Sequence, residues 1–333
     1  MSAPSMHNYS AENTFDRKAA DAKDVIKQNR ATLIGLSAIV IWGLMFGFVR
    51  RTSVAFGECL GPALVYSLAA IIAFVGYRPS PVRELPRLYV LVSGGLFIAY
   101  ESVLALSIGL ATSSEQTLEL SLVNYLWPSL LVLMGAFATK YGWLDDDCAS
   151  SKYPRHRVVR YVLPGVAVAT FGVLLAVGGN NGLDAGVMAQ DIASNPIPFA
   201  LTFAGACMWS IYSTFTGRLA EGKDATAYFL AGVAVFMWAM FFANGAEVPA
   251  TAFSPDSLFW LVGAAASIGA GYIFWGYGLQ HGDIKKMGIG SYAAPLISVI
   301  FSVLILGVKL VPIFWVGTVC VVAGSLINWR LSR

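Results

Sequence analysis

The chain contains ten apolar runs that are each long enough to cross a lipid bilayer as a helix. A helix needs roughly 17–25 apolar residues to span the hydrocarbon core, whereas a barrel strand needs about 10 residues of alternating polarity. The runs have the longer, unalternating form, so the sequence predicts membrane-spanning helices. They lie near residues 32–49, 59–77, 87–110, 114–138, 158–179, 197–217, 225–244, 257–279, 284–307 and 311–329.

The composition agrees with a surface that faces lipid. Hydrophobic residues make up 57% of the 333 residues and charged residues only 12%, whereas about 25% of the residues in a soluble domain are charged. The net charge of +3 gives no reason to expect a nucleic-acid partner. The four cysteines and three histidines are dispersed, so we expect neither a disulfide framework nor a metal site, and no cofactor.

The second half of the chain repeats the first. Landmarks that are far apart share one offset of 167 residues, namely Trp42 with Trp209, Arg51 with Arg218, and Tyr125-x-x-Pro128 with Tyr292-x-x-Pro295. Each half holds an odd number of predicted helices, so the second half must cross the membrane in the opposite sense. The predicted fold class is therefore an all-α integral membrane protein, with ten transmembrane helices arranged as two inverted five-helix repeats.

The lysines and arginines predict which side of the membrane the termini face, because these residues favour the cytoplasm. With a cytoplasmic N-terminus, only Arg50, Arg51 and Lys309 of the 22 lysines and arginines fall outside, and both termini are cytoplasmic. The tail is expected to be flexible, with an amphipathic helix near 15–28 as the alternative. The expected parts are the tail (1–30), the first four helices (31–139), a cytoplasmic loop (140–157), the fifth helix (158–180), an outer loop (181–196) and the second repeat (197–330).

Pro128 and Pro295 fall inside the fourth and ninth predicted helices. A proline there removes one backbone hydrogen bond and exposes a carbonyl one turn back. In lipid that carbonyl must find a partner or line a cavity. A plain kink is the alternative reading, but the paired placement favours two hinges beside a central cavity.

Aromatic side chains gather in the middle of the predicted helices. Interfacial belts would place them at helix ends. Flat rings suit substrates that carry a ring, although ordinary helix packing is the alternative for part of the set. The candidate binding residues of this kind are Trp42, Tyr100, Tyr125, Trp127, Trp209, Tyr212 and Tyr292, with the amide of Asn124 beside them.

Three charged residues complete the candidate site. Glu101 lies in the middle of the third predicted helix, where a carboxylate must face a cavity, a partner or a bound proton. A structural carboxyl bonded to a neighbouring helix is the alternative. Glu119 and Lys286 stand at equivalent repeat positions, each nine residues before its proline. They either line opposing entrances or extend to water.

Glycines with a seven-residue spacing occur in the fifth and tenth predicted helices, as Gly165 and Gly172 and as Gly317 and Gly324. A seven-residue step returns nearly to the same helix face. Small residues on one face let two helices approach closely. We therefore expect packing seams at these glycines.

These features resemble the drug/metabolite transporter superfamily, whose EamA-type repeats hold five helices each. The resemblance covers about residues 31–330 and includes the tryptophans of the first and sixth helices, the hairpins that lead to Pro128 and Pro295, and the pattern of Trp315, Gly317 and Gly324. Within the superfamily, the segments Tyr100-Glu101, Asn124 to Pro128 and Gly290-Ser291-Tyr292 look like the YddG-type aromatic amino acid exporters of bacterial inner membranes. The chain departs from the general pattern at Gly307-Val308-Lys309-Leu310, where a Gly-Glu-Arg-Leu-like segment is usual.

The resemblance implies a monomeric inner-membrane carrier that exports aromatic and related amino acids by alternating access. Its expected partners are the amino acid substrate and the bilayer. An exporter of other metabolites or drugs is the runner-up, with cationic compounds included if Glu101 is ionised. A channel and a polytopic membrane enzyme acting on a lipid substrate are alternatives of other classes. The sequence leaves the energy source open between facilitated diffusion and proton exchange.

Overall fold

The computed structural model describes residues 7–140, 155–178, 192–250, 252–282, 287 and 290–331. These residues form helices joined by short connections, and none of them lies in a strand. The α-helices are α1 (His7–Gly43), α2 (Met45–Phe56), α3 (Leu60–Gly76), α4 (Gly94–Gly109), α5 (Ser114–Asn124), α6 (Trp127–Lys140), α7 (Arg155–Gly178), α9 (Pro196–Ala220), α10 (Thr226–Ala243), α11 (Pro255–His281), α13 (Ala294–Leu306) and α14 (Pro312–Leu331). A short 3₁₀ turn, η1 (Val82–Glu84), and a π-helical segment, η2 (Tyr89–Ser93), precede α4.

The helices fall on the apolar runs that the sequence defines. Four segments have the length and hydropathy of membrane spans, namely Val25–Phe56, Tyr89–Gly109, Thr226–Ala243 and Pro255–Gly278. Four shorter apolar helices occupy Leu60–Gly76, Leu163–Ala176, Ala294–Leu306 and Pro312–Ile327. The prediction of an all-helical membrane protein is therefore confirmed.

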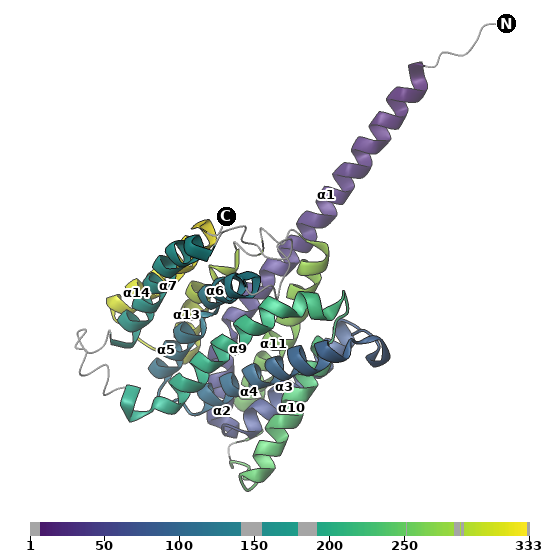
Figure 1. The fold of residues 1–333 in the computed structure, drawn as a ribbon. Helices are drawn as coiled ribbons and strands as arrows, with labels where there is room; N and C mark the ends of the chain where they lie inside the picture. Colours follow the sequence, from purple (N-terminus) through teal and green to yellow (C-terminus); the bar gives the residue numbers. More distant parts are fainter. Residues whose placement is uncertain are drawn as a thin grey trace, which may run out of the picture.

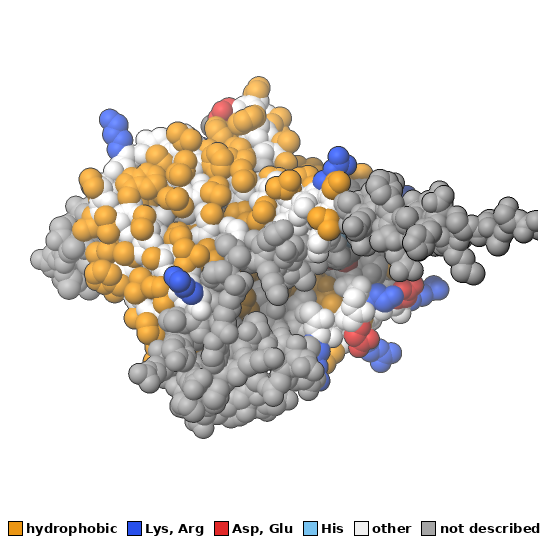
Figure 2. Space-filling view, turned by 90° about the horizontal axis from the view of Figure 1, so that it is seen from above, with side chains coloured by type: hydrophobic (Ala, Val, Ile, Leu, Met, Phe, Trp, Pro, Cys, Tyr) orange, Lys and Arg blue, Asp and Glu red, His pale blue; other side chains and the backbone are white. Residues whose placement is uncertain are grey.

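Much of the surface is apolar. Val75, Leu91, Leu304 and Val235 are each at least 69% exposed. Figure 2 shows apolar side chains gathered over a broad part of one face, with few charged groups among them. Water would disfavour such a continuous apolar surface, whereas lipid tails solvate it.

The N-terminal segment differs from the flexible tail that we expected from its polar sequence. Helix α1 begins at His7 and continues without a break to Gly43. Figure 1 shows its N-terminal part projecting away from the other helices. The polar segment thus continues the helix of the first apolar run.

The prolines begin helices instead of interrupting them. Helix α5 ends at Asn124 and α6 begins at Trp127, so Pro128 stands in the first turn of a new helix. Pro295 likewise stands in the first turn of α13, after a turn at Tyr292 and Ala293. The first turn tolerates proline because its N–H groups have no helical partner. The expectation of prolines inside continuous helices is corrected to breaks just before them.

The connection between α4 and α5 is short, as the sequence predicts. Ser113 caps α5, since its hydroxyl accepts a hydrogen bond from the Gln116 backbone N–H at 3.0 Å. The Gln116 side-chain oxygen accepts in return from the Thr112 N–H at 2.8 Å. This reciprocal cap satisfies free donors at the helix start and fixes a tight turn.

The 167-residue repeat is visible in the helix boundaries. Helix α3 spans Leu60–Gly76, and one repeat length later α10 spans Thr226–Ala243. Helix α6 begins at Trp127 and α13 at Ala294, which are one repeat length apart. The two halves therefore fold into matching sets of helices.

The contacts between helices occur in pairs that the repeat relates. Helix α4 packs against α9, and their counterparts α11 and α1 also pack together. Helix α3 packs against its own counterpart α10, and α7 against α14. Exchange of the two halves leaves this pattern unchanged, as a two-fold relation requires. Most of these contacts join the halves, so the chain forms one interleaved bundle.

The glycine seams lie where α7 meets α14, side by side at one edge of the bundle (Figure 1). A Cβ atom built on Gly172 would lie 2.5 Å from the Gly317 carbonyl oxygen, and one built on Gly317 would lie 2.5 Å from the Gly172 carbonyl oxygen. Gly324 meets Gly165 and Ala169 in the same way. The packing seams are confirmed, and the backbones touch because these positions carry no side chain.

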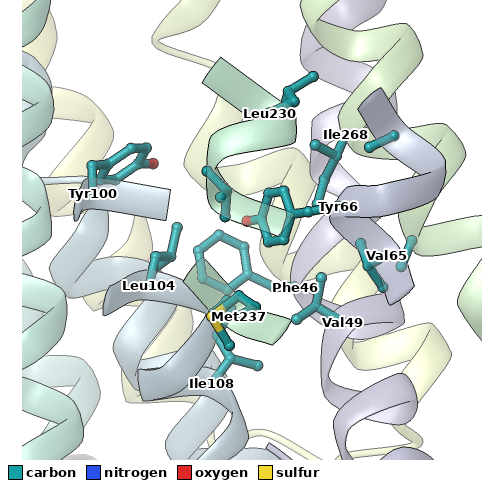
Figure 3. Packing of buried hydrophobic residues seen from close by; sticks show 14 of the residues in the cluster. Phe46, Val49, Val65, Tyr66, Tyr100, Leu104, Ile108, Leu230, Met237 and Ile268 are labelled. Atoms are coloured by element: carbon teal, nitrogen blue, oxygen red, sulfur yellow. The ribbon is translucent and has the colours of Figure 1, made fainter. Parts of the chain in front are cut away.

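The buried apolar core also lies between the two halves. Figure 3 shows Phe46 and Val49 of α2 beside Leu104 of α4 and Met237 of α10. Phe46 and Met237 are both 0% exposed. This close packing fixes α2, α3, α4 and α10 around the polar groups described next.

Candidate functional site

Trp209 of α9 stands at the centre of an aromatic cluster. Its ring stacks on Tyr212, with centroids 5.0 Å apart and planes 23° apart. It also lies 4.9 Å from the Tyr100 ring and 6.4 Å, edge to face, from Trp127. These spacings lie within the range of favourable ring contacts. Four of the predicted binding residues are thus brought together from α4, α6 and α9.

Small and polar residues position these rings. A Cβ atom on Gly205, one turn before Trp209, would lie 3.3 Å from Val103 and 3.4 Å from the Tyr100 ring, so α4 and α9 approach closely at this point. Ser210 donates a hydrogen bond to the Trp127 carbonyl at 3.0 Å. Trp127 and Trp209 are only half-buried, so part of each ring surface is not covered by the protein.

Tyr272 of α11 extends the cluster to Trp42. Its ring lies 5.2 Å from Trp42, 5.1 Å from Phe97 and 6.3 Å from Trp209. Trp42 lies against Gly271, where a side chain would collide with the indole. The predicted residue Trp42 therefore joins the same cluster through Tyr272, which the sequence did not single out.

Glu101 of α4 is 2% exposed and accepts two hydrogen bonds from tyrosine hydroxyls. Tyr66 of α3 donates to Oε2 at 2.5 Å. Tyr272 donates to Oε1. Hydrogen bonds from neutral donors to a carboxylate are stronger than those between neutral groups. The carboxylate thus has a partner on each oxygen in this conformation.

Asn124 is the last residue of α5 and is 3% exposed. Its side chain lies beside the Tyr100 hydroxyl. Its side-chain oxygen Oδ1 has no hydrogen-bond partner among the described residues. A buried acceptor without a donor is costly, so this atom is suited to receive an N–H or O–H group from a ligand.

Tyr125 and Tyr292, which the repeat pairs, lie at the breaks that precede α6 and α13. Tyr125 is buried, and its ring packs 6.1 Å from Phe46 instead of joining the rings around Trp209. Its hydroxyl lies beside Ser298 of α13. Tyr292 is half-buried in the turn before α13. These two tyrosines mark the breaks before α6 and α13.

The two candidate entrance residues remain a prediction. Glu119 is half-buried in α5. Lys286 lies outside the described residues, so the structure does not test their pairing. The main chain of Pro128 and Pro295 lies in the first turns of α6 and α13, next to the breaks at Tyr125 and Tyr292.

Three residues of the site were not among the sequence candidates, namely Tyr66, Phe97 and Tyr272. Tyr66 and Tyr272 hold Glu101, and Phe97 packs against both Trp209 and Tyr212 at 6.2 and 5.6 Å. The sequence holds one signal for the tyrosines, because a lone carboxylate within a span requires donors from neighbouring helices. It does not say which of the many tyrosines supply them.

A second set of polar contacts joins the two halves of the chain, in the loop that precedes α4. The Ser80 N–H donates to the Asp224 carbonyl at 2.9 Å, and the Asp224 N–H donates to the Ser80 hydroxyl at 3.0 Å. Lys223 pairs with Glu84 at 2.5 Å. Burial raises the pKa of the Asp224 carboxyl above its ordinary value, although hydrogen bonds from Thr226 oppose the shift. These contacts connect the α3–α4 and α9–α10 loops.

The fold and the site define a polytopic helical membrane protein with a cluster of aromatic and polar side chains between two repeated halves. A model of the EamA-like transporter family matches residues 197–330. The protein named aromatic amino acid exporter YddG from Salmonella typhimurium (strain 14028s / SGSC 2262) is 35% identical over 306 residues, which cover 91% of this chain and 98% of that protein. The protein of the same name from Escherichia coli (strain K12) is 33% identical over 308 residues, with 92% and 99% covered.

The chain therefore belongs to the EamA-like transporter family of the drug/metabolite transporter superfamily, and it is similar to the YddG-type members. A solved crystal structure with 23% identity shares the fold at a TM-score of 0.60, with 92% of this chain and 98% of that chain covered. The family resemblance inferred from the sequence motifs is confirmed.

Proposed function

We propose that this protein exports amino acids, chiefly aromatic ones, by alternating access through a cavity between its two halves. The similarity to proteins named aromatic amino acid exporter, over more than 90% of the chain, supports the substrate class. The family match supports a carrier and not an enzyme.

The observation that carries the proposal is the pairing of ring surface with polar groups at one place. Half-buried rings from both halves, namely Trp127, Tyr212 and Tyr272, contact Trp209, and Asn124 presents an unpartnered acceptor beside Tyr100. An aromatic amino acid has the matching parts, namely a flat ring, an ammonium group and a carboxylate. Stacking supplies affinity without directional bonds, which suits a site that must also release its ligand.

The proposed setting is a bacterial inner membrane, with ten spans and both termini in the cytoplasm. Two of the three basic residues that this orientation places outside have partners that hold them in place. Arg50 donates to the carbonyl oxygens of Ile108 and Gly109 at the end of α4, at 3.3 and 3.2 Å. Arg51 donates to the Ile305 carbonyl at 3.0 Å. A cation at a helix C-terminus is favourable, which accounts for these exceptions to the charge rule.

The breaks at Pro128 and Pro295 are proposed as the hinges of the alternating motion. The first separates α5 from α6 and the second directly precedes α13, so a change of a few backbone angles there reorients the helix that follows. Glu119 and Lys286 are proposed to line the two entrances, as their repeat positions indicate.

A second candidate is an exporter of cationic metabolites or drugs. Glu101 favours it, because a buried carboxylate within a ring cluster attracts organic cations as well as amino acids. The two candidates differ in whether a substrate needs its own carboxylate.

Counterflow in proteoliposomes tests the proposal. Vesicles loaded with unlabelled tryptophan should accumulate labelled tryptophan or phenylalanine above the level of empty vesicles, with saturation. Lysine and a permanently cationic aromatic compound serve as comparison substrates, and runs with and without a pH gradient separate facilitated diffusion from proton exchange. No specific accumulation of any amino acid would contradict the substrate assignment, and accumulation of the cation alone would favour the second candidate.

A further inference from the structure

Glu101 links the two halves of the chain within the site. Tyr66 belongs to the same half as Glu101, whereas Tyr272 comes from the repeated half. The two hydroxyls occupy different carboxylate oxygens. Release of Oε1 would therefore remove a contact between the halves, whereas release of Oε2 would remove only a contact within the first half.

The surroundings of the two tyrosines differ. Tyr66 is 2% exposed and lies in the core with Phe46, Val65 and Leu230 (Figure 3). Tyr272 is half-buried and lies among the rings of Trp42, Phe97 and Trp209. A ligand whose ring enters the aromatic cluster thus approaches Glu101 on its Oε1 side.

Tyr272 also lines a small pocket between α3, α10 and α11, whose enclosed space of about 10 Å³ is the size of one water molecule. Small residues form part of its wall, including Ala73, Ala227 and Gly276.

We propose that the Tyr272 hydroxyl and the ammonium group of an amino acid substrate compete for the same carboxylate oxygen, Oε1 of Glu101. This inference rests on the proposed amino acid substrate. Substrate binding then replaces a contact between the halves with a contact between one half and the substrate. The ammonium group is the stronger partner because it carries a charge that the phenol lacks.

Because the two groups compete, substrate binding and the loss of the Glu101–Tyr272 contact between the halves occur together. A ligand can shift a conformational equilibrium only by interacting differently with its two states. The ammonium group meets this condition, because it approaches Oε1 from the aromatic cluster, on the side that Tyr272 occupies. An aromatic acid without an amino group would enter the cluster but leave the Tyr272 contact in place.

Two matched variants test the proposal, since each removes one hydroxyl from Glu101 and keeps the ring. Tyr272→Phe removes the competitor, so the half-saturation concentration for tryptophan should fall about fivefold, the size expected for one net hydrogen bond. Tyr66→Phe removes a donor that still positions the carboxylate when substrate is bound, so the half-saturation concentration should rise. Equal changes in both variants, or no fall in Tyr272→Phe, would overturn the proposal.

A measurement on the unaltered protein covers the case in which a variant does not fold. Tryptophan should compete with labelled tryptophan far better than 3-indolepropionate, which has the ring and carboxylate but lacks the ammonium group. Equal competition by the two would also overturn the proposal. If the unaltered protein neither binds nor transports tryptophan, the proposed function fails instead, so the two failures are distinguishable.

Discussion

Trp209 contacts five aromatic rings on four helices, more than any other predicted site residue for which ring contacts are described. Replacing it by alanine removes the central surface on which a substrate ring would stack. Trp209→Ala should raise the half-saturation concentration for tryptophan at least tenfold, on the order of the value of one to two ring contacts. Trp209→Phe should recover part of the loss, as measured by counterflow.

The matched control for this variant is Trp238→Ala. Trp238 packs on Phe241 and Phe242 of its own helix and donates to Ser67 of α3, and none of its described ring contacts is with the Trp209 cluster. Both variants lose an indole and both should lower thermal stability. An unchanged half-saturation concentration in Trp209→Ala, or an equal rise in Trp238→Ala, would show that the cluster only packs helices.

Asp224 makes stability depend on pH. Its pKa is raised by burial, so the folded state binds the proton more tightly than the unfolded state. The stabilisation is complete below the unfolded pKa of about 4 and is lost as pH rises through the folded value. The melting temperature in detergent should therefore fall over this window, and Asp224→Asn should flatten the fall. If the melting temperature of Asp224→Asn still falls with pH in the same way, other groups cause the pH dependence.

Residue types and depths within the predicted helices identified much of the aromatic cluster, because buried rings in mid-span are visible as a pattern. The partners of Glu101 were not predictable in the same way. Tyr66 and Tyr272 are 35 and 171 residues from it in sequence. Which tyrosines meet the carboxylate depends on how three helices rotate against one another. Spacing within one helix carries no information on that rotation.

At the scale of helices, the seam between α7 and α14 tolerates no side chain. Gly172→Ala places a Cβ atom 2.5 Å from a backbone oxygen, so the helices must separate. We expect a destabilisation of about 1–3 kcal/mol, typical of overpacking. Gly217→Ala is the control, since a Cβ there meets nothing within 4 Å. Denaturation in detergent should show that Gly172→Ala is less stable than the unaltered chain and that Gly217→Ala is equally stable or more stable. The reverse order would contradict close packing of α7 against α14.

The existence of the helices was predictable, whereas their breaks were not. A run of apolar residues predicts that a span exists, because lipid demands helices. It does not distinguish one continuous helix from two that meet at a turn. The turn at Leu44 between α1 and α2, and the break at Tyr125 before α6, both fall inside predicted apolar runs. The structure of the polar segment after His7 was not predictable either, because its composition is equally compatible with a flexible tail and with a helix.

At the scale of the molecule, the halves hold each other through many interleaved helices. A chain cut between Gly178 and Ile192 and expressed as two fragments should therefore reassemble in the membrane. The α1–α11, α4–α9, α3–α10 and α7–α14 contacts all cross the cut. Co-purification of an untagged fragment with a tagged one measures this outcome. A cut inside α4 is the control and should not reassemble; failure of the first cut would contradict the interleaved arrangement.

The offset of 167 residues predicted the repeat, and the matching helix bounds confirm it. The odd helix number predicted an inversion, which remains a proposal together with the orientation of the termini. The sequence did not reveal how the halves pack. That α3 meets its own counterpart is a property of the shared interface, which repeated sequences allow but do not require.

The reciprocal contact of Gly172 with Gly317, and the contact of Gly324 with Gly165, have an evolutionary consequence. In an assembly of two identical halves, every inherited substitution appears on both sides of the axis. Once the halves are joined in one chain, each copy varies independently. Glu101 and Tyr66 stand where the second half carries Ile268 and Val233. A fused pair can thus hold a carboxylate on one side of its axis only, an asymmetry that two identical halves cannot inherit.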